Sequence, residues 1–387
     1  MDKLAIITTH PIQYNAPFFK LLAERKNIKI KVFYTWSQSK EGKKFDPGFG
    51  QEVIWDIPLL DGYDYVFVNN SASDPGSHHY KGMQNPTLIN EIKEWGPDAV
   101  LIYGWNFKSH LAALRYFKNK IPVFFRGDST LLNETAGFKK IIRRFFLKYI
   151  YSFVDFAFYV GIANKAYFKA HGLGEEQLVF MPHAIDNKRF ELNEKNAAAG
   201  VWIRDKYAIN TEAMVFLFAG KLDSNKNVVF LINSFIAIKA QNCFLLIAGT
   251  GMQEEELKEI ACKHNNIKFL GFQNQEQMPG IYASANIFVL PSINETWGLS
   301  MNEAMAAGLA IIASNGCGGA YDLIKDGING FVFKLKDINS LNNAFSYLTE
   351  NNEEVNKMGI ASQKMIEKYS YSFDCMALEN KLKSTVV

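Results

Sequence analysis

Residues 287–314 read Ile287-Phe-Val-Leu-Pro-Ser-Ile-Asn-Glu-Thr-Trp-Gly-Leu-Ser-Met-Asn-Glu-Ala-Met-Ala-Ala-Gly-Leu-Ala-Ile-Ile-Ala-Ser314. The apolar run Ile287–Leu290 has the length of a buried strand, and Ala310–Ala313 is a second run of the same kind. Between them, a glycine-containing loop leads into a helical pattern that begins near Ser300. A strand, a helix and another strand in this order predict a parallel β-α-β unit, because parallel neighbours need a long crossover connection.

The same rhythm extends over the rest of the chain. Short apolar runs rich in Val, Ile and Phe alternate with longer helix-like segments, which is typical of a parallel sheet covered on both faces. In the first half these runs are Leu4–Ile7, Ile28–Tyr34, Ala99–Ile102, Val123–Phe125 and Phe156–Val160. In the second half they are Val215–Phe218, Phe244–Ala248, Ile267–Leu270, Ile287–Leu290 and Ala310–Ala313. The sequence therefore predicts an α/β protein with two doubly wound, Rossmann-like domains.

The chain length supports two domains. A chain of 387 residues exceeds the size at which a single hydrophobic core stops growing, about 250 to 300 residues. A polar, alanine-rich stretch without strand pattern, residues 191–200, places the junction near residue 190. We predict an N-terminal domain over 1–190, a C-terminal domain over 191–370, and a final helix over 371–387 that packs back on the first domain. Because ligands bind at the carboxyl ends of parallel strands, we expect the two domains to face each other across a ligand-binding cleft.

The composition excludes several classes of protein. A hydrophobic fraction of 48% with 21% charged residues is ordinary for a globular chain, and a net charge of +3 is too small for a typical nucleic-acid-binding protein. The four cysteines form no Cys-x-x-Cys pair, so we expect neither a zinc site nor a disulfide framework. No apolar run approaches the roughly 20 residues of a membrane span. These features favour a soluble protein of the reducing cytoplasm.

Two carboxylates frame the loop that follows Leu290. Glu295 lies on the approach, and Glu303 lies in the first turns of the expected helix. The free N–H groups and the positive dipole of a helix start attract a diphosphate, and carboxylates accept hydrogen bonds from sugar or ribose hydroxyls. The alternative is a solvated loop glutamate and a second glutamate that only compensates the helix dipole.

Glu295 and Glu303, separated by seven residues and followed by Ala-Met-Ala-Ala-Gly, resemble the E-x7-E signature of family 4 glycosyltransferases with the GT-B fold. Upstream, Ala219-Gly220-Lys221-Leu222 with Lys226 resembles the Gly-Arg/Lys-Leu element of the same family. The resemblance implies that Lys221 and Lys226 contact the donor diphosphate, where ammonium groups stabilise the charge of the leaving group. It assigns Glu295 to the donor sugar and Glu303 to the ribose.

The resemblance also implies a nucleotide pocket in the second half of the chain. Its remaining residues are Gly220, Gly249, Thr250, Gly251, Met278, Thr296, Trp297, Gly298 and Leu299. Gly249 and Gly251 are predicted to let the backbone approach the ligand closely, with a simple tight turn as the alternative. Asp322 departs from the family pattern, which often has Glu at this position.

The first half departs further from the family pattern. The segment Thr9-His10-Pro-Ile-Gln13-Tyr resembles a subgroup of the family, and His10 and Gln13 are predicted to bind a diphosphate or an acceptor hydroxyl. Helix capping or core packing is the alternative for His10. Many relatives carry a histidine after the strand that corresponds to Val123–Phe125, whereas this chain reads Arg126-Gly-Asp128-Ser. We predict that Asp128 or Arg126 takes the position beside the reacting centre.

Two further side chains follow the predicted strand Ala99–Ile102. Trp105 and Asn106 are candidate acceptor contacts, with core packing as the equal alternative for the tryptophan. His183 lies where relatives often have Asn-Gly, and we place it at the hinge between the domains.

The resemblance implies a retaining reaction that transfers a hexose or N-acetylhexosamine. The expected donor is a UDP-sugar, with a GDP-sugar as second choice, and the expected acceptor is a glycan or a lipid-linked glycan. The chain contains no Asp-x-Asp pair, the spacing that holds a divalent ion against a diphosphate, so we predict that neither a metal nor another cofactor is needed. The alternatives are a sugar-nucleotide epimerase or hydrolase and a non-catalytic sugar-nucleotide-binding subunit.

A basic and aromatic segment covers residues 138–150. Its cations and apolar side chains recur at helical spacing, which is typical of helices that lie on an anionic membrane surface. We therefore consider peripheral membrane contact through this segment. The alternative is a crossover helix whose apolar face packs on the sheet.

Overall fold

The computed structural model describes residues 1–37, 44–46, 51–53, 55–132, 134 and 137–386. The chain divides into two compact units. The N-terminal unit comprises Met1–Lys44, Ile57–His183 and Tyr371–Val387, and the C-terminal unit comprises Phe45–Asp56 and Ala184–Ser370. The main division thus lies between residues 183 and 184, a few residues before the position expected from composition.

The N-terminal unit is built on a seven-stranded sheet in the order β5-β2-β1-β6-β7-β8-β9. Its strands are β1 (Lys3–Thr8), β2 (Lys29–Tyr34), β5 (Tyr65–Phe67), β6 (Ala99–Tyr103), β7 (Val123–Arg126), β8 (Phe156–Tyr159) and β9 (Leu178–Phe180). Every neighbouring pair is parallel, and Ile6 of β1 lies between Val32 and Leu101. Burial on both faces explains why the inner strands β1, β6 and β7 read as continuous apolar runs.

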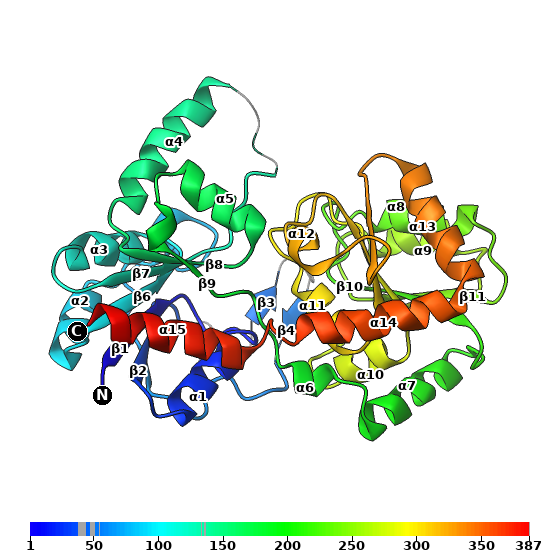
Figure 1. Cartoon of the computed structure of the whole chain (residues 1–387), viewed down its shortest axis with the longest axis horizontal. Helices are drawn as coiled ribbons and strands as arrows, with labels where there is room; N and C mark the ends of the chain where they lie inside the picture. The colour runs from blue at the N-terminus through cyan, green and yellow to red at the C-terminus, as the bar shows by residue number, and fades with distance from the viewer. Residues whose placement is uncertain (38–43, 47–50, 54, 133, 135–136, 387) are drawn as a thin grey trace. The chain divides into compact units, whose positions relative to one another are not determined.

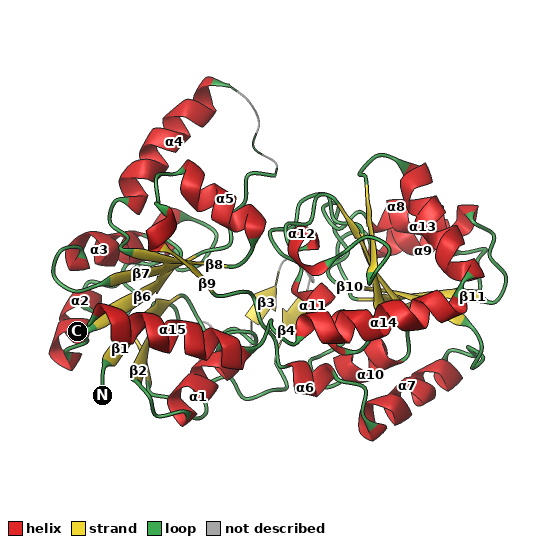
Figure 2. Cartoon of the chain, viewed as in Figure 1, coloured by secondary structure: helices red, strands yellow, loops and turns green. Residues whose placement is uncertain are grey.

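Helices lie on both sides of this sheet (Figure 2). They are α1 (Ala16–Glu24), α2 (Leu88–Trp95), α3 (Lys108–Phe117), α4 (Phe138–Tyr151), α5 (Ile162–Ala170) and α15 (Tyr371–Thr385), with short 3-10 helices η2 (Tyr80–Gly82) and η3 (Glu175–Gln177). One core contains Phe33, Ile102 and Phe125 together with α2, α3 and α5 residues. The other contains Phe19, Leu101 and Leu378 and lies under α1 and α15.

The C-terminal unit repeats this architecture with six parallel strands in the order β12-β11-β10-β13-β14-β15. The strands are β10 (Met214–Ala219), β11 (Cys243–Ala248), β12 (Ile267–Gly271), β13 (Ile287–Leu290), β14 (Ala310–Ser314) and β15 (Gly330–Phe333). A separate two-stranded sheet pairs β3 (Lys44–Asp46) with β4 (Gln51–Val53). The strand order of the large sheet reverses between β10 and β13, which is the position where open α/β sheets bind ligands.

The helices of the C-terminal unit complete the alternation. They are α6 (Asn187–Phe190), α7 (Glu194–Lys206), α8 (Val228–Ala237), α9 (Glu254–Ala261), α10 (Met278–Ala283), α11 (Leu299–Ala306), α12 (Ala320–Leu323), α13 (Ile338–Glu350) and α14 (Asn352–Ile366). The predicted fold class, two doubly wound α/β domains, is confirmed. Sequence analysis missed β3 and β4 and the edge strands β5, β9 and β15, which are only partly buried and so lack the signal of a strand covered on both faces.

The last helix, α15, belongs to the N-terminal unit and lies beside α1 (Figure 1). Arg25, just after α1, donates to both carboxylate oxygens of Glu379 at 2.7 and 2.9 Å, and Asn27 donates to the same carboxylate at 2.9 Å. Although burial opposes ionisation, these bonds hold the pKa of Glu379 below its usual range. This bidentate pair and the buried side chains of Leu378 and Leu382 fix the end of the chain to the first unit.

Helix α4 exposes much of its apolar surface. Its large exposed side chains are Phe138, Ile141, Ile142, Phe145, Phe146 and Tyr149, and its buried ones are Leu147, Ile150 and Tyr151. The first two turns of α4 therefore do not pack as a crossover helix would, and only the last turns cover the sheet. Within the part of the chain that the structure describes, no helix has the length and apolar character needed to span a bilayer.

Candidate functional site

Two loops of the C-terminal unit are joined where the strand order reverses. The loop after β10 carries Asn225, whose side chain accepts a hydrogen bond from the Asn294 N–H at 3.1 Å and donates to the Asn294 carbonyl at 2.8 Å. The carbonyl of Asn225 accepts from the Ile293 N–H at 2.7 Å. These bonds hold the loop after β10 against the loop after β13, so the side chains that follow them share one edge of the sheet.

Lys226 and Glu295 meet across this joint. The Lys226 ammonium donates to Oε2 of Glu295, and each of the two side chains is 20% exposed. The backbone of Glu295 is fixed independently, because its N–H donates to the Gly316 carbonyl at 3.1 Å and its carbonyl accepts from the Gly318 N–H at 2.8 Å. Two residues predicted from separate motifs are thus in direct contact and still reach solvent.

Helix α11 begins beside this pair. Gly298, the residue before the helix, has φ +93°, and a Cβ atom there would lie 2.6 Å from Cδ2 of Leu290. Both the positive φ and the close approach therefore require glycine. Glycine brings no capping side chain, so within the first turn of α11 the capping residue offers only its carbonyl, which accepts from the Met301 N–H at 2.8 Å. The helix start can act as a donor group for an anion.

Glu303 and Trp297 lie deeper than expected. Glu303 is only 3% exposed and accepts a 2.7 Å hydrogen bond from the Tyr282 hydroxyl of α10. Trp297 is also buried and donates from Nε1 to Asn302 Oδ1 at 2.8 Å. The structure thus places Glu295 at the accessible edge and Glu303 in the buried support beneath it.

Gly249 and Gly251 serve contact between loops. A Cβ atom at Gly249, which has φ +138°, would lie 1.8 Å from the Gly220 carbonyl oxygen, and one at Gly251 would lie 2.5 Å from the Leu222 carbonyl oxygen. The Leu222 N–H donates to the Thr250 carbonyl at 2.9 Å, which continues this contact. Packing of the loop after β11 on the loop after β10 therefore accounts for both glycines.

The other residues predicted for the nucleotide pocket lie in the same unit. Lys221 directly follows Gly220 at the end of β10, and its side chain is half-buried. Thr296 and Leu299, on the loop and first turn of α11, are half-buried as well. Met278 is buried at the start of α10.

In the N-terminal unit, His10 follows β1 directly. Its Nδ1 lies 3.0 Å from the Thr9 hydroxyl, and its ring meets the ring of Trp36 edge-on with 5.2 Å between centroids. Gln13 is half-buried in the loop before α1. Both residues therefore lie just after the carboxyl end of β1, which pairs with β2 and β6.

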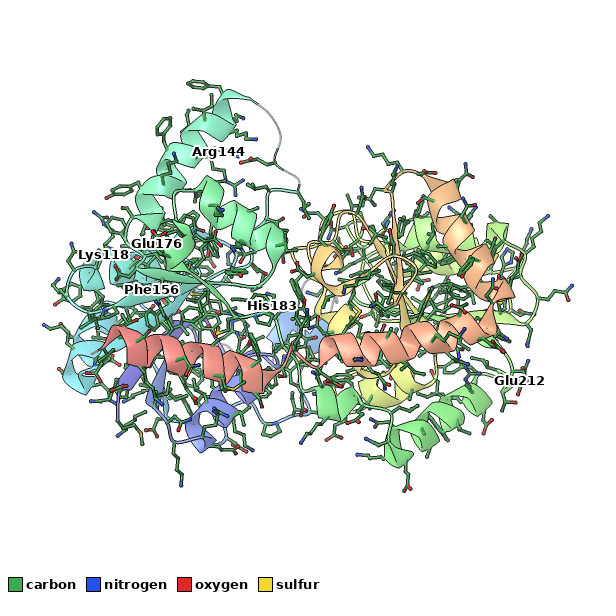
Figure 3. The ribbon with its side chains drawn as sticks, in the orientation of Figure 1. Lys118, Arg144, Phe156, Glu176, His183 and Glu212 are labelled. Atoms are coloured by element: carbon green, nitrogen blue, oxygen red, sulfur yellow. The ribbon has the colours of Figure 1, made fainter. Side chains whose placement is uncertain are left out.

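The end of β7 is connected to the segment after β9. Arg126 is 6% exposed, and its guanidinium donates to the carbonyls of Met181 at 2.6 Å and Pro182 at 2.9 Å. The next residue, His183, has its Nε2 3.7 Å from Oδ2 of Asp128. Figure 3 labels His183 in this segment. Arg126 thus anchors the backbone that brings His183 to Asp128.

The electrostatic setting of His183 favours its neutral form. Burial lowers the pKa of His183 and the Arg126 charge lowers it further, whereas the Asp128 carboxylate opposes the change. Sequence analysis placed His183 at a hinge and missed this pairing. The signal was a histidine and an aspartate that each follow a parallel strand, because such strand ends share one edge of a sheet.

Trp105, a candidate acceptor contact, and His110 of α3 both have structural roles. The ring of Trp105 packs against Phe146 with centroids 5.7 Å apart, so its packing alternative is supported. His110 is fully buried between the Tyr103 carbonyl and the Thr35 hydroxyl, each at 2.9 Å. Burial lowers the pKa of His110 to about 4, which keeps it neutral.

Comparisons with known proteins agree with this geometry. The family model described as glycosyl transferases group 1 matches residues 202–365, which include both joined loops. An uncharacterized glycosyltransferase of Methanocaldococcus jannaschii is 31% identical over 160 residues, 40% of each chain. A sulfoquinovosyl transferase of Arabidopsis thaliana is 21% identical over 78% of this chain and 60% of its own. The chain thus spans less than two thirds of the length of either relative.

Solved structures show the same fold over the whole chain. Anabaena HepE, in complex with UDP and glucose, superposes with a TM-score of 0.73 at 16% identity and covers 99% of this chain and 100% of its own. Similarity at this level of identity establishes the two-domain α/β fold.

We expect Gly249→Ala to destabilise the C-terminal unit by about 3 kcal/mol or more, because a Cβ atom would force the two loops apart. Gly327→Ala is the matched control: Gly327 has φ +74° but nothing within 4 Å of the added atom. The control should lose only the backbone term of about 1 kcal/mol. Urea unfolding measures both variants. Equal losses of unfolding free energy in the two variants would contradict the role of Gly249 in packing the two loops.

Proposed function

We propose that this protein is a glycosyltransferase that moves a hexose or N-acetylhexosamine from a nucleotide-diphosphate sugar to a glycan or lipid-linked acceptor. One observation carries the proposal: at the reversal of strand order, joined loops bring Lys226, Glu295 and the uncapped start of α11 to one edge. The group 1 family match over residues 202–365 supports it.

The donor diphosphate is assigned to Lys221, Lys226 and the first amides of α11. Departure of a nucleoside diphosphate builds negative charge on its oxygens, and fixed cations and a helix start stabilise that charge. Before the donor binds, Glu295 holds the Lys226 ammonium in place. In the complex, the Lys226 ammonium binds the diphosphate, and the Glu295 carboxylate accepts hydrogen bonds from sugar hydroxyls. This arrangement needs no divalent ion at the diphosphate.

We assign the donor as a UDP-sugar. The complex of HepE with UDP and glucose on the same fold supports a uridine nucleotide. Glu303 is assigned to the ribose, and the hydrogen bond from the Tyr282 hydroxyl fixes the orientation of its carboxylate.

We propose transfer with retention at the anomeric carbon. The acceptor oxygen forms the new bond to this carbon on the face from which the diphosphate leaves, and the bond from the carbon to the phosphate oxygen breaks. The acceptor proton passes to the departing phosphate oxygen, so that the nucleoside diphosphate is the second product. Lys221 and Lys226 stabilise the charge that develops on the leaving group.

The acceptor is assigned to the N-terminal unit. His183 beside Asp128 offers a neutral imidazole that can accept a hydrogen bond from an acceptor hydroxyl. His183 thereby takes the place of the histidine that many relatives carry after the strand equivalent to β7. His10 and Gln13 provide further polar groups at the same edge of this sheet.

We also propose that α4 contacts an anionic membrane surface, which suits a lipid-linked acceptor. Phe138 and Phe145 are 74% and 70% exposed, and Lys139, Arg143 and Lys148 are exposed on the same helix. Figure 3 shows side chains that project from α4, with Arg144 labelled. Aromatic side chains enter the headgroup region while neighbouring cations bind lipid phosphates.

Replacing Lys221 or Lys226 by alanine should lower kcat for sugar transfer about tenfold or more, because each variant removes a cation from the leaving group. Lys263→Ala is the matched control, since Lys263 is an exposed lysine of the same unit outside the joined loops. Product formation from UDP-sugars measures the effect. Unchanged transfer in both variants would refute these roles, and donor consumption without an acceptor would favour a hydrolase or epimerase.

Replacing His183 by alanine should lower kcat/KM for the acceptor about tenfold, the value of one hydrogen bond to a reacting hydroxyl. The pH profile gives a second test. Because the pKa of His183 is lowered, wild-type activity should persist below about pH 6.5 and then fall as the imidazole is protonated. Asp128→Asn removes the charge that raises this pKa and should shift the acid limb to lower pH. A shift to higher pH would contradict the assignment.

The double variant Phe138→Ser/Phe145→Ser should lose binding to vesicles that contain acidic lipids, because it removes the two most exposed rings of α4. Ile360→Ser is the control, since Ile360 is 68% exposed on α14. Vesicle flotation at low and high salt measures binding. If the wild-type protein does not float with acidic vesicles at low salt, α4 is not a membrane contact.

A further inference from the structure

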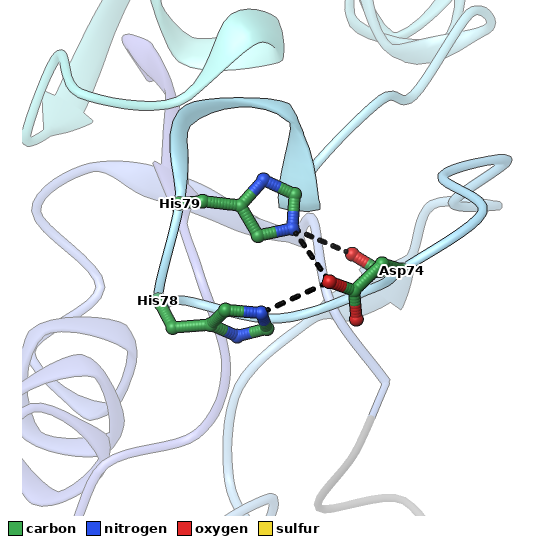
Figure 4. Close-up of side chains that lie close together, drawn as sticks. All are labelled: Asp74, His78 and His79. Atoms are coloured by element: carbon green, nitrogen blue, oxygen red, sulfur yellow. Dashed lines mark hydrogen bonds and ion pairs between the residues drawn. The ribbon is translucent and has the colours of Figure 1, made fainter.

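A second polar cluster lies in the N-terminal unit, in the loop between β5 and α2. Nε2 of His78 lies 3.1 Å from Oδ2 of Asp74, and Nε2 of His79 lies 3.2 Å from the same oxygen. Figure 4 shows both imidazole rings directed at this one carboxylate. One ligand atom from each of the three residues lies within 4.8 Å of the others.

The loop that carries this cluster is closed on itself. The Asn70 side chain accepts hydrogen bonds from the N–H groups of Ala72 at 3.1 Å and Gln84 at 2.9 Å, and it donates to the Gly82 carbonyl at 2.9 Å. The Gly76 N–H donates to the same Gly82 carbonyl at 3.1 Å. The two sides of the loop are therefore tied together at its base.

Two glycines make room for this closure. A Cβ atom at Gly82 would lie 2.0 Å from the Gly76 carbonyl oxygen, and one at Gly76 would lie 2.5 Å from Nδ1 of His78. Glycine at position 82 lets the backbone approach that of Gly76, and glycine at position 76 leaves space for the His78 ring. The relative positions of the three side chains thus follow from a built loop.

We propose that Asp74, His78 and His79 form a binding site for a divalent late first-row transition ion of the Zn²⁺ class. Two imidazole nitrogens and one carboxylate are ligands that suit such ions, and three protein ligands leave a position for water. Two atoms that each lie about 2.0–2.1 Å from a tetrahedral ion are about 3.3–3.4 Å apart, close to the two histidine–carboxylate separations of 3.1 and 3.2 Å.

The site differs in chemistry and place from the proposed diphosphate site. Its nitrogen ligands disfavour Mg²⁺ and Ca²⁺, which prefer oxygen ligands. It lies on the N-terminal unit, and an ion there would cross-link residues 74 and 78–79 and so stiffen the loop between Asn70 and Gln84. Metal binding at this site is therefore independent of the proposed activity.

The test uses the full chain without an affinity tag, titrated with ZnCl2 by calorimetry. Wild type should bind one ion at this site, and His78→Ala and His79→Ala should each weaken binding about tenfold or more. His264→Ala is the matched control, because His264 is a partly exposed histidine of the other unit, two residues from the exposed Cys262. The control should bind Zn²⁺ like wild type.

Hydrogen exchange supplies a readout in the protein with no substitution. Zn²⁺ should slow amide exchange in residues 70–84, and Mg²⁺ at the same concentration should not. Zinc binding that survives in the His78→Ala/His79→Ala double variant, or that is lost in His264→Ala, would overturn the proposal. Equal protection of the loop by Mg²⁺ would overturn it as well.

Discussion

The candidate site depends on the hydrogen bonds that join Asn225 to residues 293 and 294. The reversal of strand order places the ends of β10 and β13 side by side, but strand order alone leaves their loops free to diverge. Asn225 holds the loops together through its side chain and its carbonyl. Lys226, the next residue, is thereby placed on Glu295. Without this joint, the cation and the carboxylate would belong to two unrelated loops.

The Lys226–Glu295 pair is stable without a ligand and still accessible to one. Both side chains are largely covered, so each would be unfavourable there without an opposite charge. Both also keep some contact with solvent, which lets a charged ligand replace either partner. Gly298 adds a third feature, because α11 begins beside the pair at this residue, which has a positive φ and no capping side chain. Backbone geometry and paired charges thus prepare the same edge of the sheet.

Sequence analysis could predict whatever leaves a local signal. The fully buried inner strands, the glycine before α11 and the spacing of Glu295 and Glu303 can all be found, whereas β5, β9 and β15 are partly buried edge strands with a weaker apolar signal. Gly249 was expected to admit a ligand, but the structure shows that it admits the Gly220 backbone. The pairing of His183 with Asp128 requires knowing that their two strands end at one edge of the sheet, and the cluster around Asp74 requires knowing how its loop folds back. Residue spacing alone gives neither.

Calorimetric titration with UDP and with uridine, in the presence of EDTA, tests the central claim most directly. If the joined loops and the start of α11 receive a diphosphate without an ion, UDP should bind in EDTA, and uridine should bind about a hundredfold more weakly because it lacks the charged groups. Equal affinity for UDP and uridine, or binding of UDP only when Mg²⁺ is added, would contradict the account.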